Sequence, residues 1–164
     1  MTYGGATLNK WEIKLKTKES KMDFMVSMLR QVMLGLKKIH ILGYSHGDLK
    51  PENICARQSN NDSSIKFTLI DLGMSARLNR LGDKNEGFKF RGNLMFASTD
   101  HIIRNRPSQL CDLYSLLCVA YAFVHGRLPW IEYISKADKR KCKKDLYERE
   151  NYVELRIKKR EYFD

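Results

Sequence analysis

Hydrophobic residues recur at helical spacing in two long stretches of the chain. The first runs from about 22 to 40, and the second covers 108–124. Ser20, followed three residues later by Asp23, is typical of a helix start, and Gly43 is typical of the turn that follows a helix. The second stretch is apolar almost all round, so we expect its helix to lie at the centre of the fold.

Two shorter stretches between these helices have the composition of strands. Residues 54–56 and 66–70 are mostly apolar or β-branched, and 58–64 between them is rich in Asn, Ser and Asp. This pattern predicts a hairpin-like pair of strands joined by an exposed turn. From 73 to 98 the chain has no clear period, which indicates a long loop. The sequence therefore predicts a mainly α fold with a small β component, in the α+β class.

Composition narrows the class of protein but does not choose a partner. A length of 164 residues suits a single domain, and a net charge of +11 favours acidic partners. We expect no specific nucleic acid, because no nucleic-acid-binding signature is present. Residues 114–124 are too few to span a membrane. The four cysteines lack zinc or disulfide spacing and the N-terminus does not read as a signal peptide, which favours a cytoplasmic or nuclear location.

Residues 46–53 carry the pattern of a phosphoryl-transfer loop. Asp48 could accept a hydroxyl proton, Lys50 could contact a transferred phosphate, and Asn53 could hold a metal ion. Asp71 follows an apolar run and precedes Leu72 and Gly73. A carboxylate at the end of a buried strand, followed by a flexible Gly, suits a hard cation that bridges phosphate oxygens. The two motifs together predict chemistry on a nucleotide phosphate.

Three further motifs follow in order: Arg91 to Ser98 with His101, Asp112 to Leu116, and Leu128-Pro129-Trp130. With the two motifs above, they resemble the C-terminal lobe of eukaryotic-type protein kinases, in the casein kinase I and vaccinia-related kinase group. The resemblance covers about 3–130. It implies that Asp48 orients and deprotonates a Ser or Thr hydroxyl and that Lys50 offsets charge on the phosphoryl group. It also implies that Asn53 and Asp71 hold Mg²⁺ ions on ATP.

The resemblance assigns structural roles as well. Tyr3, Gly4 and Gly5 would belong to a hinge at 3–8 that borders the adenine, and 71–98 would be the activation segment. His46 would fix the catalytic loop, and Asp112 would accept hydrogen bonds from the backbone of that loop. Gly47 stands where many kinases have Arg, so we do not expect switching by phosphorylation of the activation segment.

The N-terminal lobe is expected to be absent from this chain, which would begin at the hinge. The resemblance therefore implies a C-lobe only, with an incomplete ATP site. The segment 136–160 holds eleven Lys and Arg against five acidic residues. We interpret it as a solvated helix face, with a docking surface for an acidic partner as the alternative.

Three functions remain open from the sequence. The first is a casein kinase I-like Ser/Thr kinase, incomplete as this chain, that acts on an acidic or already phosphorylated protein. The second is a non-catalytic kinase-lobe mimic or scaffold that binds a partner kinase or its substrate. The third is a binding module that uses the basic tail and has no role in phosphoryl transfer.

Overall fold

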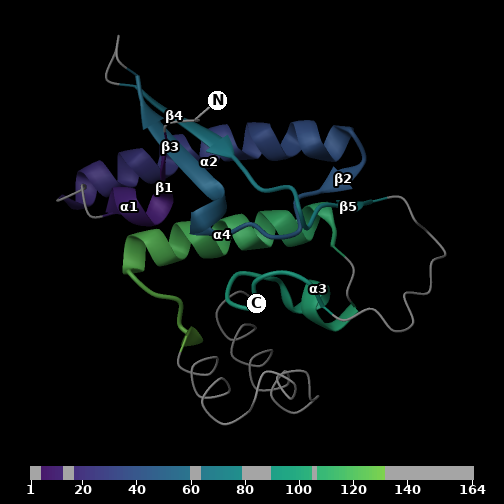
Figure 1. The fold of residues 1–164 in the computed structure, drawn as a ribbon. Helices are drawn as coiled ribbons and strands as arrows, with labels where there is room; N and C mark the ends of the chain where they lie inside the picture. The colour runs from purple at the N-terminus through teal and green to yellow at the C-terminus, as the bar shows by residue number, and fades with distance from the viewer. Residues whose placement is uncertain (1–4, 13–16, 60–63, 79–89, 105–106, 132–164) are drawn as a thin grey trace.

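The computed structural model describes residues 5–12, 17–59, 64–78, 90–104 and 107–131 (Figure 1). Tyr3, Gly4 and the basic segment 136–160 lie outside the described residues. The elements are, in chain order, β1 (Ala6–Thr7), α1 (Leu8–Glu12), α2 (Lys18–Ile41), β2 (Tyr44–Ser45), the 3-10 turn η1 (Pro51–Asn53), β3 (Ile54–Gln58), β4 (Ile65–Leu69), β5 (Ala76–Arg77), α3 (Thr99–Arg104) and α4 (Gln109–His125).

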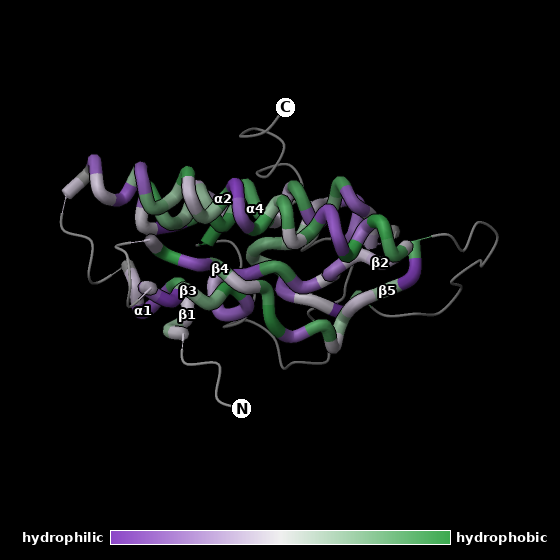
Figure 2. Tube along the Cα trace, turned by 90° about the horizontal axis from the view of Figure 1, so that it is seen from above, coloured by the Kyte–Doolittle hydropathy of each residue, from purple (hydrophilic) through white to green (hydrophobic). Residues whose placement is uncertain are grey.

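The two long helices, α2 and α4, pack against each other and carry the other elements (Figure 1). Strand β4 packs against α2, and α3 lies on the far side of α4 from the sheet. Figure 2, seen from above, shows apolar segments of both helices side by side. Within the described ranges, none of the helices combines the length and apolarity needed to cross a membrane.

Aromatic rings join four elements into one core. Phe24 of α2 stacks on Phe123 of α4 with ring centroids 5.3 Å apart and meets Phe67 of β4 edge-on at 4.9 Å. The ring of Trp11 in α1 also packs on Phe24, with ring centroids 5.6 Å apart, and its indole N–H donates to Ala56 O. Rings at these separations stabilise a core beyond the area they bury. Phe24 thereby fixes α1, β4 and α4 around α2.

The predicted strand pair is present, with an additional strand. β3 and β4 pair antiparallel from Ile54↔Leu69 to Gln58↔Ile65, and β1 pairs with β3 on its other side. A second antiparallel pair, β2 with β5, was not predicted. Both additional pairings join short segments far apart in sequence, and two-residue strands carry no detectable period.

Helix α2 begins four residues earlier than the sequence predicted. Its N-cap is Thr17, whose hydroxyl accepts from Ser20 N at 3.1 Å, while Ser20 Oγ accepts from Thr17 N at 3.3 Å. The prediction of Ser20 as the cap is wrong, because Ser20 is the third helical residue of a capping box. Gly43 has a φ of +82° and ends the helical run as expected.

Helix α4 matches the predicted range, but not all of its surface is covered. Ser108 is the N-cap, accepting from Cys111 N, and Gly126 at a φ of +78° ends the helix. Leu110 and Leu117 are 76% and 53% exposed, so part of this apolar helix faces outward. The helix is central along its other faces.

Gln31 on α2 takes the place of a strand beside β4. Its amide nitrogen donates to Ile65 O at 2.8 Å, and its amide oxygen accepts from Phe67 N at 3.1 Å. These are the backbone groups that a neighbouring strand would use. One side chain therefore holds β4, and with it the segment that ends at Asp71, against α2.

Replacing Gln31 with Ala should lower the free energy of unfolding by about 1–3 kcal/mol, because two backbone groups lose their partners. Urea denaturation of the full chain measures the loss. The matched control is Gln58→Ala, whose side chain is exposed, with an expected change of about 0.5 kcal/mol or less. Equal losses in the two variants would contradict this role.

Candidate active site

Asp112, in the first turn of α4, organises the loop at 46–53. Its Oδ2 accepts from His46 N at 2.8 Å, and its Oδ1 accepts from Gly47 N at 2.9 Å. His40 Nε2, at the end of α2, lies 2.8 Å from the same Oδ2. Asp112 is 1% exposed, so these contacts replace the water that a carboxylate would otherwise bind. One side chain thus ties α2, α4 and the loop together.

Gly47 passes through a space that admits no side chain. Its φ is +78°, and a Cβ there would lie 2.5 Å from Met74 O. On another side, a Cβ at Gly92 would lie 3.1 Å from Gly47 O. The loop therefore needs a glycine here both for its backbone conformation and for the close approach of Met74.

His46 is fully buried and links the loop to the end of β4. Its Nδ1 accepts from Asp48 N at 3.4 Å, and its Nε2 faces Ile70 O at 3.2 Å. An N–H directed at Nδ1 and a carbonyl facing Nε2 assign the ring proton to Nε2. The neutral ring holds the backbone of Asp48 in place.

Asp48, Lys50 and Asn53 lie together in the structure. Lys50 Nζ donates to Asp48 Oδ2 at 2.5 Å. Asn53 Nδ2 donates to Asp48 O at 2.8 Å and to Asp48 Oδ2 at 3.2 Å. Asp48 Oδ1 is buried and has no hydrogen-bond partner among the described residues. One carboxylate oxygen is thus fixed by two neighbours, while the other can still accept a proton or a hydrogen bond.

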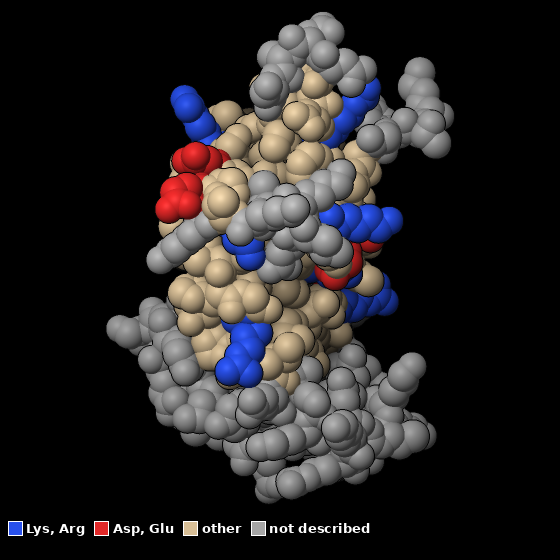
Figure 3. Space-filling model, turned by 90° about the vertical axis from the view of Figure 1, so that its left-hand side faces the viewer, with Lys and Arg blue, Asp and Glu red and all other residues tan. Residues whose placement is uncertain are grey.

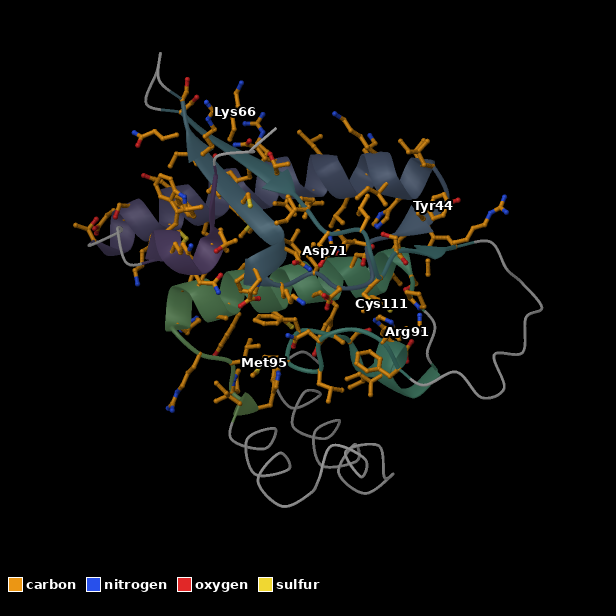
Figure 4. The ribbon with its side chains drawn as sticks, in the orientation of Figure 1. Tyr44, Lys66, Asp71, Arg91, Met95 and Cys111 are labelled. Carbon is orange, nitrogen blue, oxygen red and sulfur yellow. The ribbon has the colours of Figure 1, made fainter. Side chains whose placement is uncertain are left out.

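Asp71 reaches the same place from β4. Ile70 N donates to Asn53 O at 3.0 Å, which brings the residue before Asp71 against the end of the loop. Figure 4 shows Asp71 near the middle of the molecule, above α4. Asp71 has a φ of +63° and is exposed, and its Oδ1 accepts from Gly73 N at 3.1 Å. The exposed Asp71 thus follows directly on a residue that is hydrogen-bonded to the end of the loop.

Asn53 and Asp71 provide oxygen atoms of the kind that Mg²⁺ prefers. The Asn53 hydrogen bonds use its amide nitrogen, which leaves its oxygen outside them. Among the described residues no group of three or more His, Cys, Asp or Glu side chains could hold a metal. Mg²⁺ is often bound by one or two protein oxygens together with substrate phosphates, so this donor set fits it.

The other expected segments are described only in part. Gly5 lies against β3, where a Cβ would be 3.2 Å from Ala56 O, and Leu8 is already helical and buried. Of the segment 71–98, residues 71–78 and 90–98 are described, and Trp130 Nε1 donates to Met95 O at 2.8 Å. This bond holds the end of the segment against the chain after α4.

Two histidines near the site were not assigned a role from the sequence. His40 carries no sequence signal beyond its place at a helix end, because its partner is 72 residues away. His101 on α3 is buried, and the ring of Phe90 lies 5.1 Å away, edge-on. Burial lowers the pKa of His101 below its ordinary value, against the opposing pull of the Asp112 and Asp48 carboxylates.

A model of the protein kinase domain matches residues 3–162. The chain belongs to the protein kinase domain family. A casein kinase 1-like protein, HD16, from Oryza sativa subsp. japonica is 33% identical over 104 residues, which are 60% of this chain and 15% of that protein. The putative casein kinase I C03C10.2 from Caenorhabditis elegans is 32% identical over 106 residues, covering 61% of this chain and 30% of that protein.

A solved structure of vaccinia related kinase 3 has a similar fold, with a TM-score of 0.63 at 23% identity. The match covers 87% of this chain and 43% of that one. The resemblance to these kinases, predicted from the motifs, is therefore confirmed. The chain spans less than half the length of the kinases described here, from 15% to 43%.

Replacing Asp112 with Asn should destabilise this kinase domain by about 2–4 kcal/mol. In either orientation the new amide NH₂ would face a backbone N–H of the loop, and the charge that strengthens each bond is lost. Thermal or urea unfolding measures the effect. Asp23→Asn, at an exposed position of α2, is the matched control and should be nearly neutral. A mild loss in both variants would count against a central role for Asp112.

His101 should make stability depend on pH. Because the folded state lowers its pKa below 6.5, the unfolded chain binds the proton first as pH falls. The stabilisation is complete above pH 6.5 and is lost between that value and the lowered pKa, by up to about 1.4 kcal/mol per pH unit. His101→Gln should unfold with a smaller change in Tm between pH 7.5 and 5.5 than the natural chain or an His125→Gln control. A change in Tm that is as large in His101→Gln as in the natural chain would refute this role of His101.

Proposed function

We propose that this chain is the C-terminal lobe of a casein kinase I-like Ser/Thr protein kinase. The single observation that carries the proposal is the state of the Asp48 carboxylate. Its Oδ2 is held by Lys50 and Asn53, while its buried Oδ1 has no partner in the described part of the chain. A free acceptor fixed in one orientation is what a substrate hydroxyl needs.

In the proposed reaction, Oδ1 of Asp48 accepts a hydrogen bond from the Ser or Thr hydroxyl of a protein. The hydroxyl oxygen forms a bond to the γ-phosphorus of ATP, the bond to ADP breaks, and the hydroxyl proton passes to Asp48. Lys50 holds the carboxylate of Asp48 in one orientation, and its ammonium offsets negative charge on the phosphoryl group. Burial of the carboxylate strengthens both effects, because little water competes.

Asn53 and Asp71 would hold Mg²⁺, which neutralises charge on the ATP phosphates when bound. We propose 46–53 as the catalytic loop, 71–98 as the activation segment and 3–8 as the hinge, with Tyr3, Gly4 and Gly5 beside the adenine. His46 and Asp112 support the loop and take no part in the chemistry.

The net charge of +11 favours an acidic or already phosphorylated protein substrate. Figure 3 shows Lys and Arg side chains spread over one face, among neutral surface and a few Asp and Glu side chains. On the described part of that face the charge is therefore a general field and not one continuous basic patch. Such a field raises the rate of encounter with acidic proteins more than it selects a sequence.

A second function is supported by the apolar side chains beside the site. Leu72 and Met74 follow Asp71 and are 54% and 44% exposed. Exposed apolar side chains next to a functional site suit contact with another protein, in a scaffold or mimic that binds a kinase or its substrate. This alternative predicts capture of a kinase by the isolated chain, with no phosphate transfer.

Replacing Asp48 with Ala should lower phosphate transfer by at least about 10²-fold, because the hydroxyl loses its proton acceptor. The assay follows labelled phosphate from ATP to casein with Mg²⁺, using the chain supplied with a kinase N-terminal lobe. Asp23→Ala, at an exposed site on α2, is the control. Undiminished transfer in Asp48→Ala would refute Asp48 as the base. Absence of transfer in the natural chain, with capture of a kinase, would favour the scaffold.

A further inference from the structure

Two aliphatic side chains project from the turn that follows α2. Ile41, the last residue of the helix, is 74% exposed, and Leu42, its C-cap, is 75% exposed. Tyr44 in β2 follows and is 45% exposed. Figure 4 shows Tyr44 at the same end of the molecule as the last turn of α2. Ile41, Leu42 and Tyr44 form what we call the apolar tip.

The backbone of the apolar tip is fixed by hydrogen bonds within the chain. Leu42 N donates to Lys38 O at 3.3 Å, and Gly43 N donates to His40 O at 3.0 Å. Gly43 O accepts from Leu78 N at 2.7 Å. A Cβ added at Gly43 would meet no atom of the described residues within 4 Å beyond its chain neighbours, so the turn stands free. Because these polar groups are already paired, the turn can enter an apolar environment without leaving them unsatisfied.

Basic side chains flank the apolar tip. Lys37 and Lys38 are exposed and lie four and three residues before the last residue of α2, on its side of the helix. Arg77 is exposed and lies directly opposite Tyr44 in the β2–β5 pair, so both side chains are on the same face. No Asp or Glu occurs in 24–47. The apolar tip is therefore joined to a basic flank, formed by Lys37, Lys38 and Arg77.

We infer that the apolar tip and its basic flank dock the chain on an anionic phospholipid membrane. Ile41 and Leu42 enter the boundary between headgroups and acyl chains, and Tyr44 lies at the level of the headgroups. The basic flank faces the anionic headgroups. Such a contact lies on the membrane surface and requires no spanning helix.

The shape of the apolar tip favours a membrane over an acidic protein. Ile41 and Leu42 are about three-quarters exposed and project outward, so a protein would need a concave apolar site to cover them. A bilayer surface accepts a protruding aliphatic pair without such a match, and its anionic lipids complement the basic flank. The inference goes beyond the proposed function and uses none of the residues assigned to phosphate transfer.

Vesicle co-sedimentation with the full chain tests the inference. The natural chain should bind vesicles of phosphatidylcholine and phosphatidylserine at least about ten-fold more tightly than vesicles of phosphatidylcholine alone. The double variant Ile41→Ser/Leu42→Ser should lower this binding at least about ten-fold. The matched control, Leu110→Ser/Leu117→Ser, removes two exposed apolar side chains of α4 and should keep it. No binding to anionic vesicles, or equal loss in the two double variants, would overturn the inference.

Insertion of the apolar tip can be observed without removing any part of it. Leu42→Trp places a fluorophore at the tip, and the emission of the natural Trp11 and Trp130 is subtracted. Its emission should move to shorter wavelength on addition of the anionic vesicles, because the indole leaves water. Leu117→Trp, on the exposed face of α4, should show no such change. An unshifted emission of Leu42→Trp on vesicles that bind the chain would contradict insertion.

A third double variant separates the charge from the apolar contact. Lys37→Gln/Lys38→Gln should weaken binding to the anionic vesicles about ten-fold and leave binding to phosphatidylcholine unchanged. Binding that Ile41→Ser/Leu42→Ser does not weaken would belong to the net charge alone and would overturn the role of the tip.

Two further outcomes distinguish this inference from its competitor and from the proposed function. Binding of casein that is lost in Ile41→Ser/Leu42→Ser, in a chain that binds no vesicles, would replace the membrane by an acidic protein. Vesicle binding through the apolar tip, in a chain that transfers no phosphate even with an N-terminal lobe, would retain the membrane contact and count against the kinase.

Discussion

The carboxylate of Asp112 is the constraint on which the site depends. A buried charge is costly unless it is hydrogen-bonded, and Asp112 meets this requirement with His46 N, Gly47 N and His40. Those partners come from the loop and from the far end of α2, so satisfying one charge fixes the relative positions of three elements. At the other end of α2, the packing of Phe24 fixes the positions of β4 and α4.

Hydrogen bonds within the loop then fix the positions of Asp48 and of the end of β4. His46, fixed by its backbone, accepts from Asp48 N and reaches Ile70 O, and Asn53 holds both Asp48 and the backbone of Ile70. Asp71 follows directly, so two acidic groups separated by 23 positions in the sequence lie on one connected network. Gly47 makes this possible, since any side chain there would collide with Met74 O.

Local patterns predicted the local structure and the candidate chemistry. The periods of α2 and α4, the strand pair and the spacing of Asp48, Lys50 and Asn53 are all contained within short windows of sequence. Gln31 on the edge of β4, the β2–β5 pair and His40 beside Asp112 could not be found in this way, because each depends on a partner more than thirty residues away. That Oδ1 of Asp48 has no partner among the described residues could not be read from the sequence either, since motifs specify residues and not the hydrogen bonds of single atoms.

That oxygen argues for chemistry over a purely structural role of the loop. Leaving a buried acceptor without a partner costs about 1–3 kcal/mol, more for a charged group. The described fold gains nothing from Oδ1, because Oδ2 alone anchors Lys50 and Asn53. Retention of an unsatisfied carboxylate is the expected cost of a site that receives a hydroxyl group from outside the chain.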